Sequence, residues 1–406
     1  MKRILLVHPI LEPPGGAEGL AACFIQGLLA SGRFQLTLAT IRPPDFDGLN
    51  LYFGTQLSAS DPSLKVVVLP TARRFIGLIR LAGFRAALLE SGLLSRRIRD
   101  VAKRFGPFNL YLSTENERSF PSDASALQYI HYPAYHPVRG VGDYRWFHRL
   151  PGVLAAYRFA ANRLAGADLR QIRLNHTLAN SKFSATAYQE AHGATAQVIH
   201  PPVPGQAPEP SNWASRENRI VALGRLAKEK EIPTVISIVG NLREALAAAG
   251  TAPDQLPCLD LVGGWDCRGS LRRKIEALLD RHSAWIRLHQ GVPRASLDRF
   301  LADSRYGIHV MPDEHFGMGV AEMQRAGCVC FVPDTGGPKE IIGEDESRQI
   351  FSSPADAVNK MADVLSDSNL QTSLHQRALG RRDLFSTQRF VDACVRHVDA
   401  ALAVAE

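Results

Sequence analysis

Residues 311–342 read MPDEHFGMGVAEMQRAGCVCFVPDTGGPKEII. An apolar run ends at Met311, a short polar loop follows, and Phe316-Gly317 opens a stretch with helical spacing. A second apolar run covers 329–332 and leads into a glycine-rich turn. The order of strand, loop, helix and strand predicts a βαβ unit, whose parallel strands lie in a sheet covered by helices.

The same alternation of short β-rich runs and longer helical stretches extends along the chain in both directions. We expect strands at 4–8, 35–41, 65–69, 110–113, 127–131, 177–180 and 197–200, and again at 220–223, 259–262, 285–289, 307–311 and 329–332. Helices are expected between them, for example at 17–30, 146–165, 232–249, 271–281, 318–326 and 355–365, with an amphipathic helix at 387–405. The fold class is therefore α/β, with two doubly wound Rossmann-like domains that bind ligand at the carboxyl ends of their strands.

A proline-rich segment separates the two series of strands. Residues 201–218, PPVPGQAPEPSNWASREN, hold five prolines and little apolar content, as a linker does. We predict an N-terminal domain at 1–202, a linker at 203–218, a C-terminal domain at 219–380, and a C-terminal helix within 381–406 that packs toward the N-terminal domain. A chain of 406 residues has the length expected for two domains.

The composition is that of an ordinary soluble protein, with 45% hydrophobic and 21% charged residues. Six scattered cysteines without a CxxC pair favour reduced thiols in a cytosolic enzyme over a disulfide framework or a zinc site. No run approaches the ~18 apolar residues of a membrane-spanning helix, and the N-terminus reads as a buried strand, not a signal sequence. The net charge of +7 favours anionic partners: nucleic acid, phospholipid headgroups or nucleotide sugars.

The helix start inside 311–342 has the chemistry of a phosphate site. A helix N-terminus after a glycine-containing loop presents free N–H groups and the positive end of the helix dipole, which suits a diphosphate. A carboxylate there, such as Glu314 or Glu322, repels phosphate but accepts hydrogen bonds from neutral hydroxyls, for example a ribose diol. The alternative is that Glu314 stabilises the helix dipole and Glu322 is an ordinary solvated residue.

The run DEHFGMGVAE, followed by TGGPKEII, resembles the E-x7-E region of the retaining GT-B glycosyltransferases of large family 4. It is most similar to the mannosyltransferases that extend lipid-linked oligosaccharides with GDP-mannose. Four further matches occur in the same order as in that family: Gly15-Gly16-Ala17-Glu18, Tyr129-Ile130-His131-Tyr132-Pro133, Asn180-Ser181-Lys182-Phe183, and Gly224-Arg225-Leu226 with Lys230. The resemblance extends from about residue 4 to residue 343.

The resemblance implies a GT-B fold, in which two Rossmann-like domains face each other across a cleft, and transfer with retention of configuration. The donor is a nucleotide-diphosphate sugar, with mannose from GDP-mannose as the best guess. The acceptor is a hydroxyl of a glycan or lipid-linked sugar, and neither a cofactor nor an essential metal is implied. Asp45-Phe46-Asp47 is the only D-x-D run, and we interpret it as surface in an early proline-rich loop.

The resemblance also implies roles for individual residues. Arg225 and Lys230 stabilise the departing diphosphate, Glu322 holds the ribose, Glu314 contacts the sugar, and His131 supports the sugar or the acceptor. Gly15 and Gly16 allow positive φ and close backbone approach. The implied catalytic set is His131, Glu314, Arg225 and Lys230, and the donor-binding set is Gly15, Gly16, Arg225, Lys230, His315, Phe316, Gly317, Met318, Gly319 and Glu322. No residue is an evident general base, as in a front-face mechanism where the leaving phosphate oxygen accepts the proton.

Several alternatives stay open at this point. A GT-B sugar-nucleotide epimerase shares the fold, a glycosyltransferase acting on modified nucleic acid fits the charge, and a nucleic-acid-binding protein is disfavoured because no binding motif is present. The chain starts at its first strand, whereas the lipid-linked mannosyltransferases begin with a membrane anchor. We therefore expect a cytoplasmic protein that acts on a soluble acceptor or reaches the inner face of the membrane peripherally. The basic, apolar-interleaved stretch Arg73–Arg104 is the candidate contact, unless it forms ordinary helices with solvated arginines.

Overall fold

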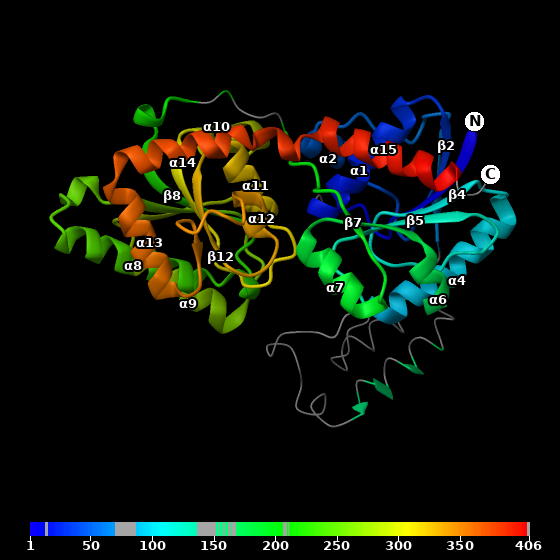
Figure 1. Cartoon of the computed structure of the whole chain (residues 1–406), viewed down its shortest axis with the longest axis horizontal. Helices are drawn as coiled ribbons and strands as arrows, with labels where there is room; N and C mark the ends of the chain where they lie inside the picture. The colour runs from blue at the N-terminus through cyan, green and yellow to red at the C-terminus, as the bar shows by residue number, and fades with distance from the viewer. Residues whose placement is uncertain are drawn as a thin grey trace. The chain divides into compact units, whose positions relative to one another are not determined.

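The computed structural model describes residues 1–12, 15–69, 87–135, 168–205, 209 and 211–403, except the side chains of 87–93, and isolated positions between 152 and 163. The chain divides into two compact units. Residues 1–202 and 390–406 form the first unit, and residues 203–389 form the second. Each unit has its own parallel sheet and its own hydrophobic core (Figure 1).

The first unit is built on a seven-stranded sheet in the order β3-β2-β1-β4-β5-β6-β7, with parallel pairing throughout. Its strands are β1 (Lys2–Val7), β2 (Phe34–Thr40), β3 (Leu64–Val68), β4 (Leu110–Ser113), β5 (Ser125–Ile130), β6 (His176–Ala179) and β7 (Gln197–Val198). Its helices are α1 (Gly16–Ala30), α2 (Phe46–Phe53), α4 (Ala87–Phe105), α6 (Leu169–Leu174), α7 (Lys182–His192) and most of α15 (Thr387–Ala403). The pattern is the doubly wound one, because strand order reverses between β1 and β4.

Side chains that alternate along β1 enter two different cores. Ile4 and Leu6 pack with α1, α2 and α15, while Leu5 and Val7 pack with α4. Burial on both faces explains why such strands read as continuous apolar runs. The C-terminal helix α15 contributes Phe390, Cys394, Val398 and Leu402 to the first of these cores, and so it belongs to the first unit.

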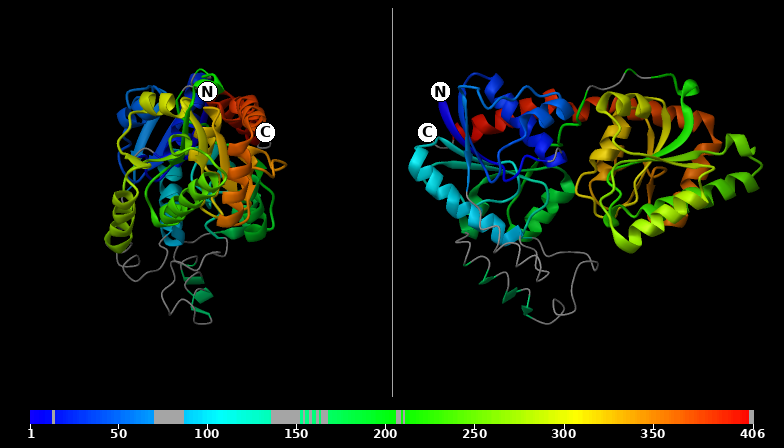
Figure 2. Two further views of the ribbon diagram at one scale, coloured as in Figure 1. Left: turned by 90° about the vertical axis from the view of Figure 1, so that its left-hand side faces the viewer. Right: turned by 180° about the vertical axis from the view of Figure 1, so that it is seen from behind.

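The second unit holds a six-stranded sheet in the order β10-β9-β8-β11-β12-β13. Its strands are β8 (Glu217–Leu223), β9 (Cys258–Val262), β10 (Ile286–His289), β11 (Ser304–Ile308), β12 (Val329–Pro333) and β13 (Ile350–Phe351). Its α-helices are α8 (Ile232–Ala248), α9 (Gly269–Arg281), α10 (Arg294–Ala302), α11 (Met318–Arg325), α12 (Pro338–Ile342), α13 (Pro354–Ser366) and α14 (Ser368–Gly380). One face of the sheet packs on α8, α9 and α13 and the other on α10, α11 and α12, an arrangement also visible from behind in Figure 2.

The predicted α/β class with two Rossmann-like sheets is confirmed. The strand β13 was not predicted, because two residues are too few to show a period of two. The start of the proline-rich segment is held by the second unit, since the Arg325 guanidinium donates hydrogen bonds to the carbonyl oxygens of Val203, Pro204 and Gly205. These three carbonyls thus have a fixed partner within the second unit.

Gly15 has φ −144 and is extended, and Gly16 is the first residue of α1, so neither uses the positive φ that glycine allows. One local prediction is wrong. The D-x-D run does not lie in a loop: Asp45 is the N-cap of α2 and accepts a hydrogen bond from the Gly48 amide at 2.9 Å. Both runs begin helices, although Asp45 and Asp47 do lie on the surface as expected.

Two predicted regions fall largely outside the described residues. The expected helix 146–165 is one, and residues 73–86 of the basic stretch are the other. In the described remainder of that stretch, α4 buries Leu94, Ile98 and Val101 in the core and exposes basic residues on its other side. Among the described helices, none combines the length and the apolar character needed to span a bilayer.

Candidate functional site

The two sheets each have a point where strand order reverses, between β1 and β4 in the first unit and between β8 and β11 in the second. Connections leave such a point in opposite directions, so a crevice opens at the carboxyl ends of the two strands. In the first unit these ends carry His8 and Thr114, and in the second they carry Arg225 and His309. Each set is described within its own unit.

At the second sheet, the end of β8 approaches its neighbours closely. Gly224 has φ +147, a conformation that side chains other than glycine rarely adopt. A Cβ atom on Gly319 would lie 2.6 Å from the Leu223 carbonyl oxygen, so α11 also meets β8 backbone to backbone. Beside this contact lies a small pocket at the end of β8. Its polar lining comes from Gly224, Arg225, Lys230 and His309.

Lys230 and Glu314, which are 84 residues apart in sequence, form an ion pair in this unit through Nζ and Oε2. Their side chains are 21% and 16% exposed, so the pair is largely removed from water. Burial alone would raise the pKa of Glu314, but the charge of Lys230 and its hydrogen bond, together with His309, hold that pKa below its usual value. Glu314 is therefore a carboxylate at neutral pH.

The glycine-rich turn after β12 supports Glu314. The Gly337 amide donates a hydrogen bond to the Glu314 carbonyl oxygen at 2.8 Å, and the Asp313 amide donates one to Thr335 Oγ1 at 3.2 Å. Gly336 has φ +80, and a Cβ on it would lie 2.6 Å from that same Glu314 oxygen. The turn needs glycine there because its backbone packs directly on the backbone of Glu314.

Arg225 lies at the same edge but is far more accessible, with 65% of its side chain exposed. It pairs with Asp266 and, at 3.5 Å, with Glu229. Exposed pairs of this kind contribute about 0–1 kcal/mol, so an incoming anion can replace these carboxylates at small cost. Arg225 and Lys230 thus bring two cations to one pocket, as two negative charges on a ligand would require.

Glu322 lies within α11 and is buried, not solvated as the alternative interpretation held. Its Oε2 pairs with Arg294 of α10, and the same guanidinium also pairs with Asp298. Although burial alone would lower the pKa of Arg294, its interactions with Glu322 and Asp298 raise it. Arg294 carries a permanent positive charge, and its ion pair with Glu322 orients that side chain. The sequence did not reveal this partner.

The start of α11 combines a helix N-terminus with a side chain of the core. Gly317 caps the helix with φ +103, and the N–H groups of the following turn, from Met318 on, precede the first intrahelical bond, Ala321 N–H to the Gly317 carbonyl at 3.0 Å. The Phe316 ring is buried and packs on Phe385, so only its backbone could reach a ligand. His315, Met318 and Gly319 are half-buried.

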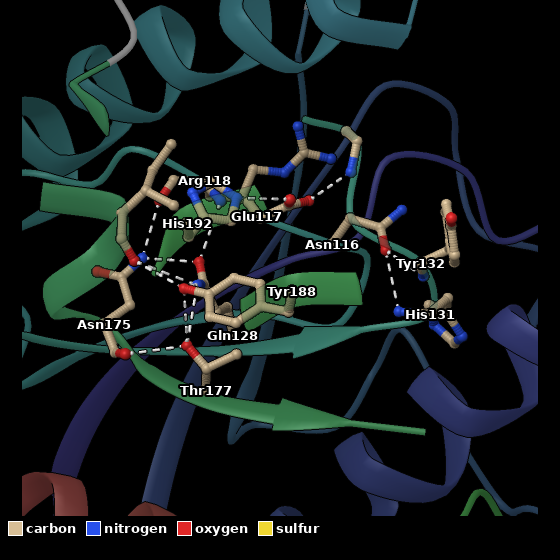
Figure 3. A network of polar contacts seen from close by, with 12 residues as sticks. Asn116, Glu117, Arg118, Gln128, His131, Tyr132, Asn175, Thr177, Tyr188 and His192 are labelled. Atoms are coloured by element: carbon tan, nitrogen blue, oxygen red, sulfur yellow. Dashed lines mark hydrogen bonds and ion pairs between the residues drawn. The ribbon is translucent and has the colours of Figure 1, made fainter. Parts of the chain in front are cut away.

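In the first unit, His131 follows β5 and is held by a network of polar contacts from the loop after β4 (Figure 3). The amides of His131 and Tyr132 both donate hydrogen bonds to Asn116 Oδ1, at 2.9 and 3.1 Å. The Ser184 hydroxyl donates to the His131 carbonyl at 2.7 Å, and His131 Nε2 lies 3.1 Å from the Thr114 carbonyl oxygen. The backbone and the ring of His131 are thereby both fixed.

Deeper in the same network, Glu117 holds the next part of the loop. Its Oε2 accepts a hydrogen bond from the Ala134 amide at 2.9 Å, and its Oε1 lies 3.0 Å from His192 Nε2. Both side chains of this pair are almost fully buried, at 0% and 2% exposure. The polar run 114–118, directly after a buried strand, is the sequence signal that could have revealed this network.

His8 follows β1 directly and is buried beside Thr114. Its Nδ1 lies 2.9 Å from Thr114 Oγ1, and burial, with smaller contributions from His131 and Arg118, lowers the pKa of His8 to about 3. His8 is therefore neutral at physiological pH. The first unit thus gathers His8, Thr114 and His131 at its switch point, while Gly15 and Gly16 start the helix that follows β1.

Comparison with known proteins places these sites in a family context. Residues 206–381 match the family described as Glycosyl transferases group 1. The protein named "GDP-Man:Man(3)GlcNAc(2)-PP-Dol alpha-1,2-mannosyltransferase" from Xenopus laevis is 30% identical over 183 residues, which are 44% of this chain and 36% of that protein. The matches cover less than half the length of such curated relatives.

Solved structures agree over nearly the whole chain. HepE from Anabaena in complex with UDP has a TM-score of 0.64 at 13% identity and covers 98% of this chain and 100% of its own. WaaG, a glycosyltransferase involved in lipopolysaccharide biosynthesis, has a TM-score of 0.64 at 13% identity and covers 96% of this chain and 99% of its own. At such identity the likeness concerns the fold. The chain therefore has the GT-B fold, and its residues 206–381 match the family of Glycosyl transferases group 1.

Proposed function

We propose that the chain is a glycosyltransferase that moves a hexose from a nucleotide-diphosphate sugar to a hydroxyl of a glycan or lipid-linked acceptor, with retention of configuration. The observation that carries the proposal is the placement of Arg225, Lys230 and Glu314 at the switch point of the second sheet. Two cations and a helix N-terminus suit a diphosphate, and a carboxylate such as Glu314 suits sugar hydroxyls. The family match over 206–381 supports the same reaction class.

In the proposed reaction, the bond from the sugar C1 to the diphosphate oxygen breaks and a bond from C1 to the acceptor oxygen forms. Negative charge develops on the leaving diphosphate, where Lys230 and Arg225 stabilise it. The acceptor proton passes to the leaving phosphate oxygen on the same face of the sugar. No essential metal and no cofactor take part in the proposed step.

Glu322 and Glu314 have different proposed roles. Glu322, oriented by Arg294, accepts hydrogen bonds from the ribose hydroxyls, and Glu314 accepts them from the donor sugar. In the first unit, His131 supports the sugar or the acceptor, and its fixed backbone and ring suit that role. Mannose from GDP-mannose is the first donor to test, because the curated relatives carry GDP-mannose and mannosyltransferase in their names.

A donor screen tests the proposal. The purified chain is titrated with GDP, UDP and a DNA duplex by calorimetry, and then incubated with GDP-mannose and other nucleotide sugars, with and without lipid-phosphate sugar acceptors. We expect one nucleoside diphosphate to bind and its sugar to be transferred only when an acceptor is present. Free sugar or an isomerised donor without acceptor would instead indicate an epimerase. Tight binding of DNA without binding of any nucleotide would exclude the proposal.

A further inference from the structure

His309 is a buried histidine at the carboxyl end of β11 that the roles proposed above do not use. Its side chain is 9% exposed, and its amide donates a hydrogen bond to the Phe331 carbonyl oxygen at 2.9 Å. It lines the same pocket as Lys230 and Arg225. The strand pairing of β11 thus fixes its backbone, while the ring points toward the candidate donor site.

The Nε2 atom of His309 is buried and makes no hydrogen bond to any described part of the chain. Burying a polar atom without a partner is unfavourable, so native proteins rarely keep one without a functional reason. The nearest acidic atom is Glu314 Oε2, 3.7 Å away, which is too far for a hydrogen bond. That oxygen is already paired with Lys230 Nζ.

Lys230 Nζ and His309 Nε2 therefore both lie near Glu314 Oε2, and only Lys230 donates a hydrogen bond to it. A diphosphate that attracts Lys230 would leave Glu314 as a buried carboxylate without its counter-charge, which is costly. A movement of less than about 1 Å would bring His309 Nε2 within hydrogen-bond distance of the same oxygen.

We propose that His309 is a positioning residue that takes over the hydrogen bond to Glu314 when Lys230 turns to the diphosphate of the donor. This inference rests on the proposed function, in which Lys230 binds that diphosphate. Burial and the charge of Lys230 lower the pKa of His309 to about 4, although Glu314 opposes the shift. The ring is therefore neutral at pH 7, and it can donate to Glu314 without adding a third cation that would compete for the phosphate.

The proposed exchange of Lys230 for His309 as the donor to Glu314 predicts an effect on binding that depends on the second phosphate of the nucleotide. A nucleoside monophosphate lacks the group that draws Lys230 away from Glu314, so its binding does not require His309. The binding of a nucleoside diphosphate does require His309. A residue that merely packs in the core would change both affinities together, and the ratio of the two affinities therefore separates the roles.

The test uses the full chain and whichever of GDP and UDP the wild type binds better, with the corresponding monophosphate. His309→Leu keeps a similar volume and removes the donor, and we expect it to weaken diphosphate binding by about tenfold or more while monophosphate affinity changes by less than about twofold. His309→Gln restores an N–H donor and should recover much of the loss. His375→Leu is the matched control, because His375 is also buried in this unit but bonds to the Gly327 carbonyl oxygen at 2.7 Å.

A second background makes the test independent of how well one variant folds. In Lys230→Met the first donor to Glu314 is absent, so there is no exchange of donors. Adding His309→Leu to this variant should therefore not change the ratio of diphosphate to monophosphate affinity any further. Equal ratios in wild type and a folded His309→Leu would overturn the inference while leaving the proposed function intact. Should His309→Leu not fold, an unchanged ratio in His309→Phe would overturn it instead. Wild type that binds no nucleoside diphosphate would overturn the proposed function itself.

Discussion

At the scale of single residues, the charged side chains of the second unit form pairs that bridge distant parts of the sequence. Lys230 with Glu314 spans 84 positions and Arg294 with Glu322 spans 28. In both pairs a cation orients a glutamate in a largely buried place. The proposed role of these glutamates, to accept hydrogen bonds from neutral hydroxyls of the donor, needs side chains that are held in place in this way.

Glu322→Gln tests the ribose role directly. The amide keeps the shape but loses the charge, and hydrogen bonds to charged groups contribute about 1.5–3 kcal/mol, so nucleotide affinity should fall by about tenfold to a hundredfold. Calorimetry with the preferred nucleotide measures it. Glu276→Gln is the control, because Glu276 also pairs with an arginine on a helix of this unit but is exposed. Unchanged affinity in Glu322→Gln would remove Glu322 from the nucleotide site.

Arg294 should matter for stability as well as for the site. Its side chain and that of Glu322 are each 10% exposed. Arg294→Met leaves the carboxylate buried and unpaired, so we expect the free energy of unfolding to fall by about 3–5 kcal/mol. The double variant Arg294→Met with Glu322→Leu should recover most of this loss, whereas Arg272→Met, at an exposed pair, should cost less than about 1 kcal/mol. Urea unfolding measures all four proteins, and a double variant no more stable than Arg294→Met would contradict the expectation.

At the scale of elements, the candidate donor site is made by strand ends and helix starts that meet backbone to backbone. The turn after β12 packs against Glu314 through Gly336 and Gly337, and α11 approaches β8 through Gly319. In the first unit, the loop after β4 fixes the loop after β5 through Asn116 and Glu117. Loops held in this way by rigid strands position side chains accurately.

Gly336→Ala tests this support. Its φ of +80 is unfavourable for alanine, and the new Cβ would also collide with the backbone of Glu314. We expect loss of stability by more than about 2 kcal/mol together with weaker nucleotide binding. Gly250→Ala is the matched control, because Gly250 has φ +93 but open space around it, so it should cost only about 1–2 kcal/mol and leave nucleotide binding unchanged. Equal effects of the two substitutions in both assays would show that the contact with Glu314 is unimportant.

At the scale of the whole molecule, each unit carries histidines whose pKa is lowered in the folded chain. Burial is the leading cause throughout: it lowers the pKa of His8 to about 3 and of His309 to about 4, and it also lowers the pKa of His176, His375 and His397. His176 Nε2 and His397 Nδ1 lie 2.9 Å apart and join β6 to α15, so protonation of both rings would separate them. Acid should therefore affect both units.

The direction of the pH effect follows from proton binding. An unfolded histidine has a pKa near 6.5, so below that pH the unfolded chain binds more protons than the folded chain does. Stability from these groups is complete above about pH 6.5 and is lost as the pH falls toward their folded pKa values. We expect the chain to unfold at a lower temperature at pH 5 than at pH 7.5, as measured by circular dichroism. His309→Leu should make the unfolding temperature of the second unit depend less on pH, and the fluorescence of Trp213, Trp265 and Trp285 reports the unfolding of that unit. Greater stability of the wild type at pH 5 than at pH 7.5 would contradict the prediction.

Much of the fold can be predicted because local patterns of apolar and polar residues indicate its strands and helices. Twelve expected strands, from 4–8 to 329–332, coincide with observed ones within a few residues, since burial on both faces gives a parallel strand a continuous apolar run. The two-residue β13 was missed, and Asp45 was interpreted as a loop residue although it caps a helix. Glycine permits a positive φ without requiring it, and Gly15 is extended.

The candidate site shows where local patterns stop being sufficient. Periodicity and the spacing of Glu314 and Glu322 identify residues that lie near one strand end, because the chain itself connects them. Which side chains meet depends on how the strands are ordered across the sheet. That order places β8, which ends at Leu223, beside β11, which begins at Ser304, although 80 residues lie between these two positions in the sequence. The pairing of Lys230 with Glu314, the burial of Glu322 against Arg294 and the unpaired Nε2 of His309 all follow from it. Pair energies act through space and not along the chain, so these features appear only once the sheet has formed.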